Sequence, residues 1–158
     1  MTISPHRALA PYIAIVGAIA FVGFAVDVSA LWLPLLAFGF AAFVMVETQQ
    51  RTIVSYHRGW WIRPTVVGGI GGLVVLALWL TGQPGRLIRI ESVLVLGLFW
   101  MAMPWSVFGP WAKYYGYALI LLAVCAALLG ELPTGYYALA IGGGSLIYAL
   151  VLRVIDGR

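Results

Sequence analysis

Six apolar runs follow one another along the chain, separated by polar segments or by turns that contain glycine and proline. A transmembrane helix needs about 20 predominantly apolar residues, with a tolerated range of about 17 to 25. Each run comes close to that length. The pattern predicts an all-α, polytopic membrane helix bundle that forms a single domain over residues 1–158. Its six transmembrane helices are expected near residues 8–26, 30–46, 65–81, 90–108, 111–129 and 135–152.

The fourth run is the least regular of the six. Its purely apolar part ends at Met103, which makes it too short to span a bilayer. Continuation through Pro104 to Phe108 gives a helix of sufficient length. Pro104 would then kink that helix, unless the segment is re-entrant and returns to the side from which it came. The pattern leaves both arrangements open.

Composition agrees with a lipid environment. Of the 158 residues, 63% are hydrophobic and 9% are charged, whereas a soluble domain has roughly 45 to 50% apolar and about 25% charged residues. A soluble fold of this length cannot remove so much apolar surface from water. The run over 8–26 is longer than the apolar core of a signal peptide, so we expect it to be a retained helix.

The basic residues indicate the orientation of the bundle. Cytoplasmic loops of membrane proteins carry the excess of Lys and Arg. Six crossings place Arg86 and Arg89 on one side and seven basic residues on the other, which predicts both termini in the cytoplasm and a multi-pass protein of the inner (cytoplasmic) cell membrane. The seven are Arg7, Arg51, Arg58, Arg63, Lys113, Arg153 and Arg158.

Small residues spaced four apart indicate where the helices pack. Lipid tails are as apolar as leucine, so helices in a bilayer associate through small residues that let their backbones approach. Gly68 and Gly72 form such a pair, and Gly142 and Gly144 each follow an alanine by four positions. We predict tight packing for the helices over 8–26, 65–81 and 135–152. The alternative for the three glycines at 142–144 is an unwound, ligand-approaching stretch, as in discontinuous transporter helices.

The sequence shows no constellation that supports catalysis or a bound cofactor. All the acids are expected at helix ends or in the tail, so no charge is expected deep in the membrane. His6, His57 and Cys125 are too few and too far apart for a metal site, and no catalytic motif is present. The predicted set of catalytic residues, cofactors and metals is therefore empty. The acids are Asp27, Glu47, Glu91, Glu131 and Asp156.

One polar segment, from Arg51 to Arg63, stands out because it combines three arginines with two tryptophans and has no acid. It fits an ordinary cytoplasmic loop that touches anionic lipid, at about 1 kcal/mol per basic residue. It also fits a docking surface, because Trp and Arg dominate interface hot spots. A second patch near 105–115 is expected on the same side. The candidate partner- or lipid-binding residues are Arg51, His57, Arg58, Trp60, Trp61, Arg63, Trp105, Trp111 and Lys113.

Three functions are compatible with this pattern. The first is an accessory membrane subunit that binds another protein, or a second copy of itself, through a basic aromatic cytoplasmic face. The second is a small transporter or channel for a neutral or apolar solute, lined by the glycine-rich helices. The third is an enzyme acting at the lipid interface, with Glu47, Arg51, His57 and Arg58 as its polar cluster. Nucleic acid is not an expected partner, because the basic residues form no stripe on a soluble face.

Overall fold

The computed structural model of the protein describes residues 13–14, 17–18, 62–130 and 132–156. Within these ranges the chain forms helices joined by short turns and contains no strand, which confirms an all-α fold for this part. The predicted helix over 30–46 and most of the one over 8–26 lie outside the described residues. The described helices are α3 (Ile62–Leu80), α4 (Gly85–Ala102), α5 (Trp105–Leu129), α6 (Thr134–Tyr137), the π-helical η1 (Ala138–Gly143) and α7 (Gly144–Asp156).

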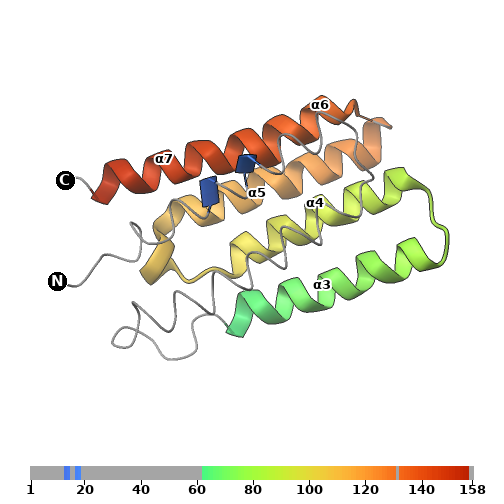
Figure 1. The fold of residues 1–158 in the computed structure, drawn as a ribbon, viewed down its shortest axis with the longest axis horizontal. Helices are drawn as coiled ribbons and strands as arrows, with labels where there is room; N and C mark the ends of the chain where they lie inside the picture. The colour runs from blue at the N-terminus through green and yellow to red at the C-terminus, as the bar shows by residue number, and fades with distance from the viewer. Residues whose placement is uncertain (1–12, 15–16, 19–61, 131, 157–158) are drawn as a thin grey trace.

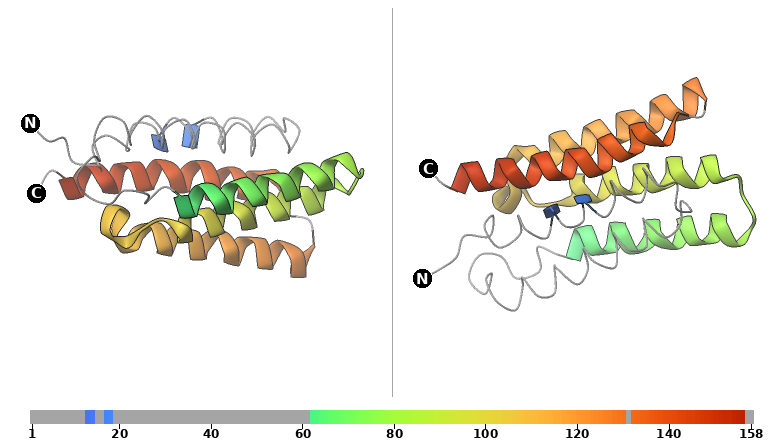
Figure 2. Two further views of the ribbon diagram at one scale, coloured as in Figure 1. Left: turned by 90° about the horizontal axis from the view of Figure 1, so that it is seen from below. Right: turned by 45° about the horizontal axis from the view of Figure 1, so that its top comes forward.

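Helices α3, α4 and α5 lie side by side and alternate in direction, and the segment from α6 to α7 runs opposite to α5 (Figure 1). Helix α4 lies between α3 and α5, while α6, η1 and α7 join end to end into a single rod that packs along α5 (Figures 1 and 2). The starts of α3 and α5 and the end of α7 therefore share one end of the bundle. The two turns, from α3 to α4 and from α5 to α6, share the other.

The turn after α3 follows from its glycine and proline. Gly82 has φ +68°, a left-handed conformation that glycine adopts without steric cost. Its N–H bonds to the Trp79 carbonyl at 3.0 Å, and the N–H of Gln83 bonds to the Leu78 carbonyl at 3.0 Å. This pair of bonds is the Schellman helix ending, and Pro84 is the N-cap of the next helix, α4.

Helix α4 differs from the helix expected over 90–108. It begins at Gly85 and ends at Ala102, so Pro104 lies between two helices rather than within one. Met103 is extended, with φ −63° and ψ 136°, as expected for the residue before a proline, whose ring disfavours the helical conformation. The 18 residues of α4 span about 27 Å, close to the roughly 30 Å of a bilayer core.

Helix α5 contains the expected break at Gly109-Pro110. Gly109 has φ +66° and ψ −167°, which bends the chain between a first turn from Trp105 and a long helix that continues to Leu129. The six residues of η1 are π-helical, so the glycines at 142–144 stay within one continuous helical rod. The described rod therefore contains no unwound stretch at these glycines.

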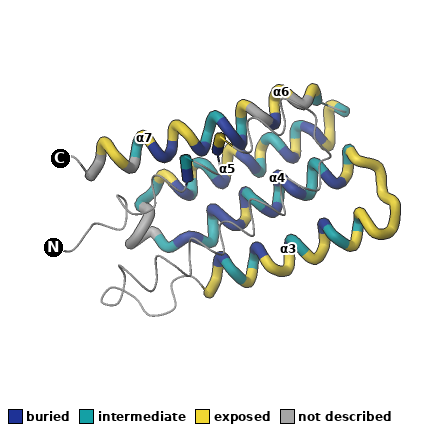
Figure 3. The backbone as a smooth tube through the Cα atoms, viewed as in Figure 1, coloured by how far each residue is buried: buried dark blue, intermediate teal, exposed yellow. Residues whose placement is uncertain are grey.

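The core lies around α4 and α5 (Figure 3). An ideal Cβ on Gly116 would lie 2.7 Å from the Gly97 carbonyl oxygen, and one on Gly97 would lie 2.9 Å from that of Gly116. The backbones of α4 and α5 therefore touch at this crossing, a contact that only glycine permits. The main buried cluster includes Val93, Phe99, Trp100, Ala112, Leu119, Ala123, Ile141, Tyr148 and, from the amino-terminal region, Ile13.

Much of the outer surface is apolar. Leu73 is 68% exposed and Leu128 is 79% exposed, and similar residues continue along the outward faces of α3, α5 and α7 (Figure 3). Two helices, Ile62–Leu80 and Gly109–Leu129, are long and apolar enough to cross a membrane. The apolar segment Gly135–Val151 is shorter.

Candidate functional site

The structure brings part of the predicted aromatic, basic face together. Arg63 lies in the first turn of α3 and is exposed, while Trp111 and Lys113 lie near the start of α5. Because α3 and α5 begin at the same end of the bundle (Figure 1), these residues share that end with the exposed Arg153 of α7. We call it the tryptophan end.

For the remaining predicted residues of this face, the structure describes at most the backbone. Trp105 begins α5, also at the tryptophan end, but its side chain is not among those described. The candidates Arg51, His57, Arg58, Trp60 and Trp61 lie outside the described residues.

An aromatic pair dominates the tryptophan end. Trp111 is 45% exposed and Tyr114 is 60% exposed. Their rings meet edge to face, with centroids 6.0 Å apart and planes at 75°. Lys113 lies between them in sequence and is half-buried. The pair therefore presents two large rings at the surface beside positive charge.

A second aromatic group lies inside the bundle, where α5 meets η1 and α7. The Tyr115 hydroxyl lies 3.0 Å from the carbonyl oxygens of both Ala140 and Ile141, and 3.1 Å from the Ser145 hydroxyl. Since a phenol has one proton, it donates to these carbonyls and accepts from Ser145. The rings of Trp100 and Tyr148 pack against that of Tyr115.

This internal group stabilises the π-helical turn. A π-helical segment shifts the backbone hydrogen bonds by one residue and often marks a functional or strained site. Here the Tyr115 hydroxyl satisfies the carbonyls of that segment. Its proton is engaged by these carbonyls, and its oxygen lies within hydrogen-bond distance of the Ser145 hydroxyl. Among the described residues, no group of three His, Cys, Asp or Glu side chains could hold a metal ion.

The predicted packing glycines have different surroundings. Gly68 and Gly142 are buried. A Cβ on Gly144 would overlap the Tyr115 ring, whereas one on Gly72 would meet nothing within 4 Å. Gly17 also packs closely, since its Cβ would lie 2.9 Å from the Gly142 carbonyl oxygen.

Three charged residues lie inside α4, where the sequence predicted a loop and a helix end. The Arg86 Nη2 donates to the carbonyls of Ala126 and Ala127, each at 3.1 Å. These are two of the last four carbonyls of α5, which have no partner within their own helix. Arg86 therefore neutralises the carboxyl end of α5 instead of extending into solvent. Arg89 is half-buried, and Glu91 lies in the second turn of α4.

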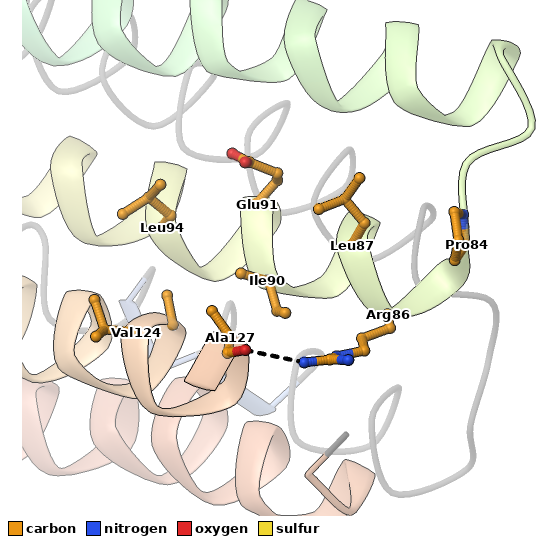
Figure 4. Close-up of a pocket in the computed structure, with 9 residues that line it drawn as sticks. Pro84, Arg86, Leu87, Ile90, Glu91, Leu94, Val124 and Ala127 are labelled. Carbon is orange, nitrogen blue, oxygen red and sulfur yellow. Dashed lines mark hydrogen bonds between the residues drawn. The ribbon is translucent and has the colours of Figure 1, made fainter. Parts of the chain in front are cut away.

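An apolar groove of about 560 Å³ runs between α4 and α5 beside these charges (Figure 4). Among the described residues of its lining, Arg86 and Glu91 are charged and the others are apolar. Figure 4 shows the Arg86 guanidinium directed toward α5, whereas the Glu91 carboxylate projects from α4 away from it. The other residues of the lining are Pro84, Leu87, Ile90, Leu94, Ala123, Val124 and Ala127.

Comparison of the chain with models of protein families, with curated proteins and with solved structures finds no match.

Sequence reasoning missed several residues that organise this site. Gly97 and Gly116 lie on different helices, so no spacing within one segment reveals their contact. Arg86 and Glu91 were assigned to a loop and a helix end because α4 was expected to begin near residue 90. The available signal was the turn at Gly82-Gln83-Pro84-Gly85, since proline commonly begins a helix and α4 follows it directly.

Proposed function

We propose that this chain is a multi-pass protein of the inner membrane with six transmembrane helices, both termini in the cytoplasm and the tryptophan end on the cytoplasmic side. The apolar outer surface supports this proposal, because lipid solvates such a surface and water does not. Two helices of spanning length support it as well. The exposed Arg63 and Arg153 at one end agree with the cytoplasmic excess of basic residues.

Within that membrane the chain serves as an accessory subunit that binds a partner through the tryptophan end. The observation that carries this proposal is the exposed pair of Trp111 and Tyr114, set beside Lys113 at the same end as Arg63 and Arg153. Aromatic residues and arginine are enriched at the centre of protein interfaces. The partner is another membrane subunit or a second copy of this chain, and anionic lipid headgroups contribute through the basic residues.

Site-directed photo-crosslinking tests this role. Trp111 is replaced by a photoreactive phenylalanine derivative in the full chain, expressed at native level in its membrane. The matched control carries the same group at Tyr136, which is 56% exposed and lies at the opposite end of the bundle. We expect one discrete adduct from position 111, identified by mass spectrometry, and none from position 136. Equal adducts from both positions, or none from position 111, would contradict the proposal.

A further inference from the structure

The groove between α4 and α5 contains a carboxylate that the rest of the described chain does not use. Glu91 is half-buried and lines the groove. Within the described part of the chain it has no hydrogen-bond or ion-pair partner. It lies six residues beyond Gly85, the first residue of α4, and is therefore about 9 Å along the helix axis.

The surroundings of Glu91 on its own helix are apolar. Leu87, Leu94 and Leu98 lie four residues before it, three after it and seven after it, so they share its face of α4. Leu87 and Leu98 are exposed large hydrophobic residues. A single carboxylate among exposed leucines is costly in a membrane and indicates a function.

Arg86 does not compensate this charge. Its Nη2 already donates to the carbonyls of Ala126 and Ala127. The carboxyl end of α5 carries about half a negative elementary charge, which offsets part of the guanidinium charge. Figure 4 shows the Glu91 carboxylate pointing away from this contact. Among the described residues that line the groove, Glu91 is therefore the negative group that remains available to a ligand.

We propose that this groove binds a lipophilic organic cation, with the positive centre at Glu91 and the apolar body along Leu87, Leu94 and Val124. The groove volume of about 560 Å³ lies within the roughly 300 to 1,000 Å³ of small-molecule sites. The described part of its lining is apolar apart from the two charged residues, which suits a hydrocarbon body better than a hydrated inorganic ion. This site lies at the end of the bundle opposite to the tryptophan end, so it is independent of partner binding there.

Two probes of equal shape and opposite charge test the proposal. Tetraphenylphosphonium and tetraphenylborate are titrated into the purified full chain in a neutral detergent, and binding is followed by isothermal calorimetry. We expect saturable binding of the phosphonium and at least about tenfold weaker binding of the borate, since the carboxylate attracts one and repels the other. Equal affinity for both ions, or no saturable binding of the phosphonium, would overturn the proposal.

Three variants locate the site. Glu91→Gln removes the charge and is expected to weaken phosphonium binding at least about tenfold. Val124→Trp fills the groove but keeps Glu91, and we expect a similar loss. Leu128→Trp adds the same ring one turn further along α5, at a residue that does not line the groove, and binding should stay unchanged. Size-exclusion chromatography and circular dichroism verify that each variant is folded. Full affinity in Glu91→Gln, or in a folded Val124→Trp, would show that the groove is not the site.

Discussion

The two ends of the described helices both carry basic residues but use them differently. At the tryptophan end, Arg63 and Arg153 are exposed beside the surface rings of Trp111 and Tyr114. At the opposite end, which we call the turn end, Arg86 bonds to two carbonyls of α5. A count of basic residues treats these arginines as equivalent. The structure shows that the arginines of one end are exposed, whereas Arg86 at the other end completes a helix terminus.

This difference also separates the two proposed activities. Large exposed rings and exposed arginines suit a protein or headgroup partner, so the tryptophan end is the proposed docking face. An apolar groove with one available carboxylate suits a small lipophilic cation, so the turn end is the proposed ligand site. Helices α4 and α5 run between the two ends, and their backbones touch at Gly97 and Gly116.

The largest loss of stability is expected from a change at the contact between Gly97 and Gly116. Gly116→Val would place side-chain atoms against the Gly97 carbonyl, which an ideal Cβ already approaches to 2.7 Å. We expect a loss of about 3 kcal/mol or more of unfolding free energy, since overpacking against backbone leaves little room to relax. Unfolding in mixed detergent micelles, followed by circular dichroism, measures it. Gly72→Ala is the control, because its Cβ meets nothing within 4 Å. Alanine favours the helix more than glycine does, so this variant should gain up to about 1 kcal/mol of unfolding free energy.

The next largest effect tests the comparison of the two ends directly. Arg86→Gln removes a charged donor from two α5 carbonyls, and we expect the unfolding free energy to fall by about 2 to 3 kcal/mol. Arg153→Gln changes an exposed arginine of the tryptophan end and should shift stability by less than about 0.5 kcal/mol. The same unfolding assay compares the two variants. Equal losses would contradict the distinction between engaged and available arginines.

A smaller loss is expected inside the bundle. Tyr115→Phe removes the hydroxyl that contacts the Ala140 and Ile141 carbonyls. Because these acceptors then lack that donor, we expect the unfolding free energy to fall by about 1 to 2 kcal/mol. Tyr117→Phe is the matched control on the same helix, since Tyr117 is 56% exposed, and its effect should be close to zero. Thermal unfolding of the purified variants gives both values. Unchanged thermal stability of Tyr115→Phe would show that the hydroxyl does not stabilise η1.

The smallest change in stability is expected at the docking face. Trp111→Ala removes an exposed ring whose contact with Tyr114 is edge to face, at a cost of about 0.5 to 1 kcal/mol. Partner recovery should fall much more, because the ring is a proposed anchor. Co-purification of the partner identified by crosslinking, compared between the wild type and this variant, measures it. Full recovery from the variant would remove Trp111 from the docking face.

The apolar runs predicted much of the described architecture. The helix expected over 65–81 is found at Ile62–Leu80, and the expected break at Gly109-Pro110 is present within α5. These features are local, since length, hydropathy and glycine or proline determine them. Pro64 falls in the first turn of α3, where a missing N–H costs little, so the helix begins before this proline rather than after it.

The parts that sequence reasoning missed depend on contacts between helices. The start of α4 at Gly85 places Arg86 inside a helix, which is tolerable because the carbonyls of α5 receive its protons. Likewise, η1 relies on the Tyr115 hydroxyl from a neighbouring helix. A single sequence gives no pairing between segments, so neither feature was predictable from periodicity.

The membrane orientation is the claim on which the proposed docking face depends, and cysteine accessibility tests it most directly. Cys125 is first replaced by serine, and single cysteines are introduced at Gln83 of the turn end and at Arg153 of the tryptophan end, both exposed positions. Intact cells are treated with a membrane-impermeant maleimide. We expect labelling at position 83 in intact cells and at position 153 only after permeabilisation. Labelling of both positions in intact cells, or of position 153 alone, would contradict it.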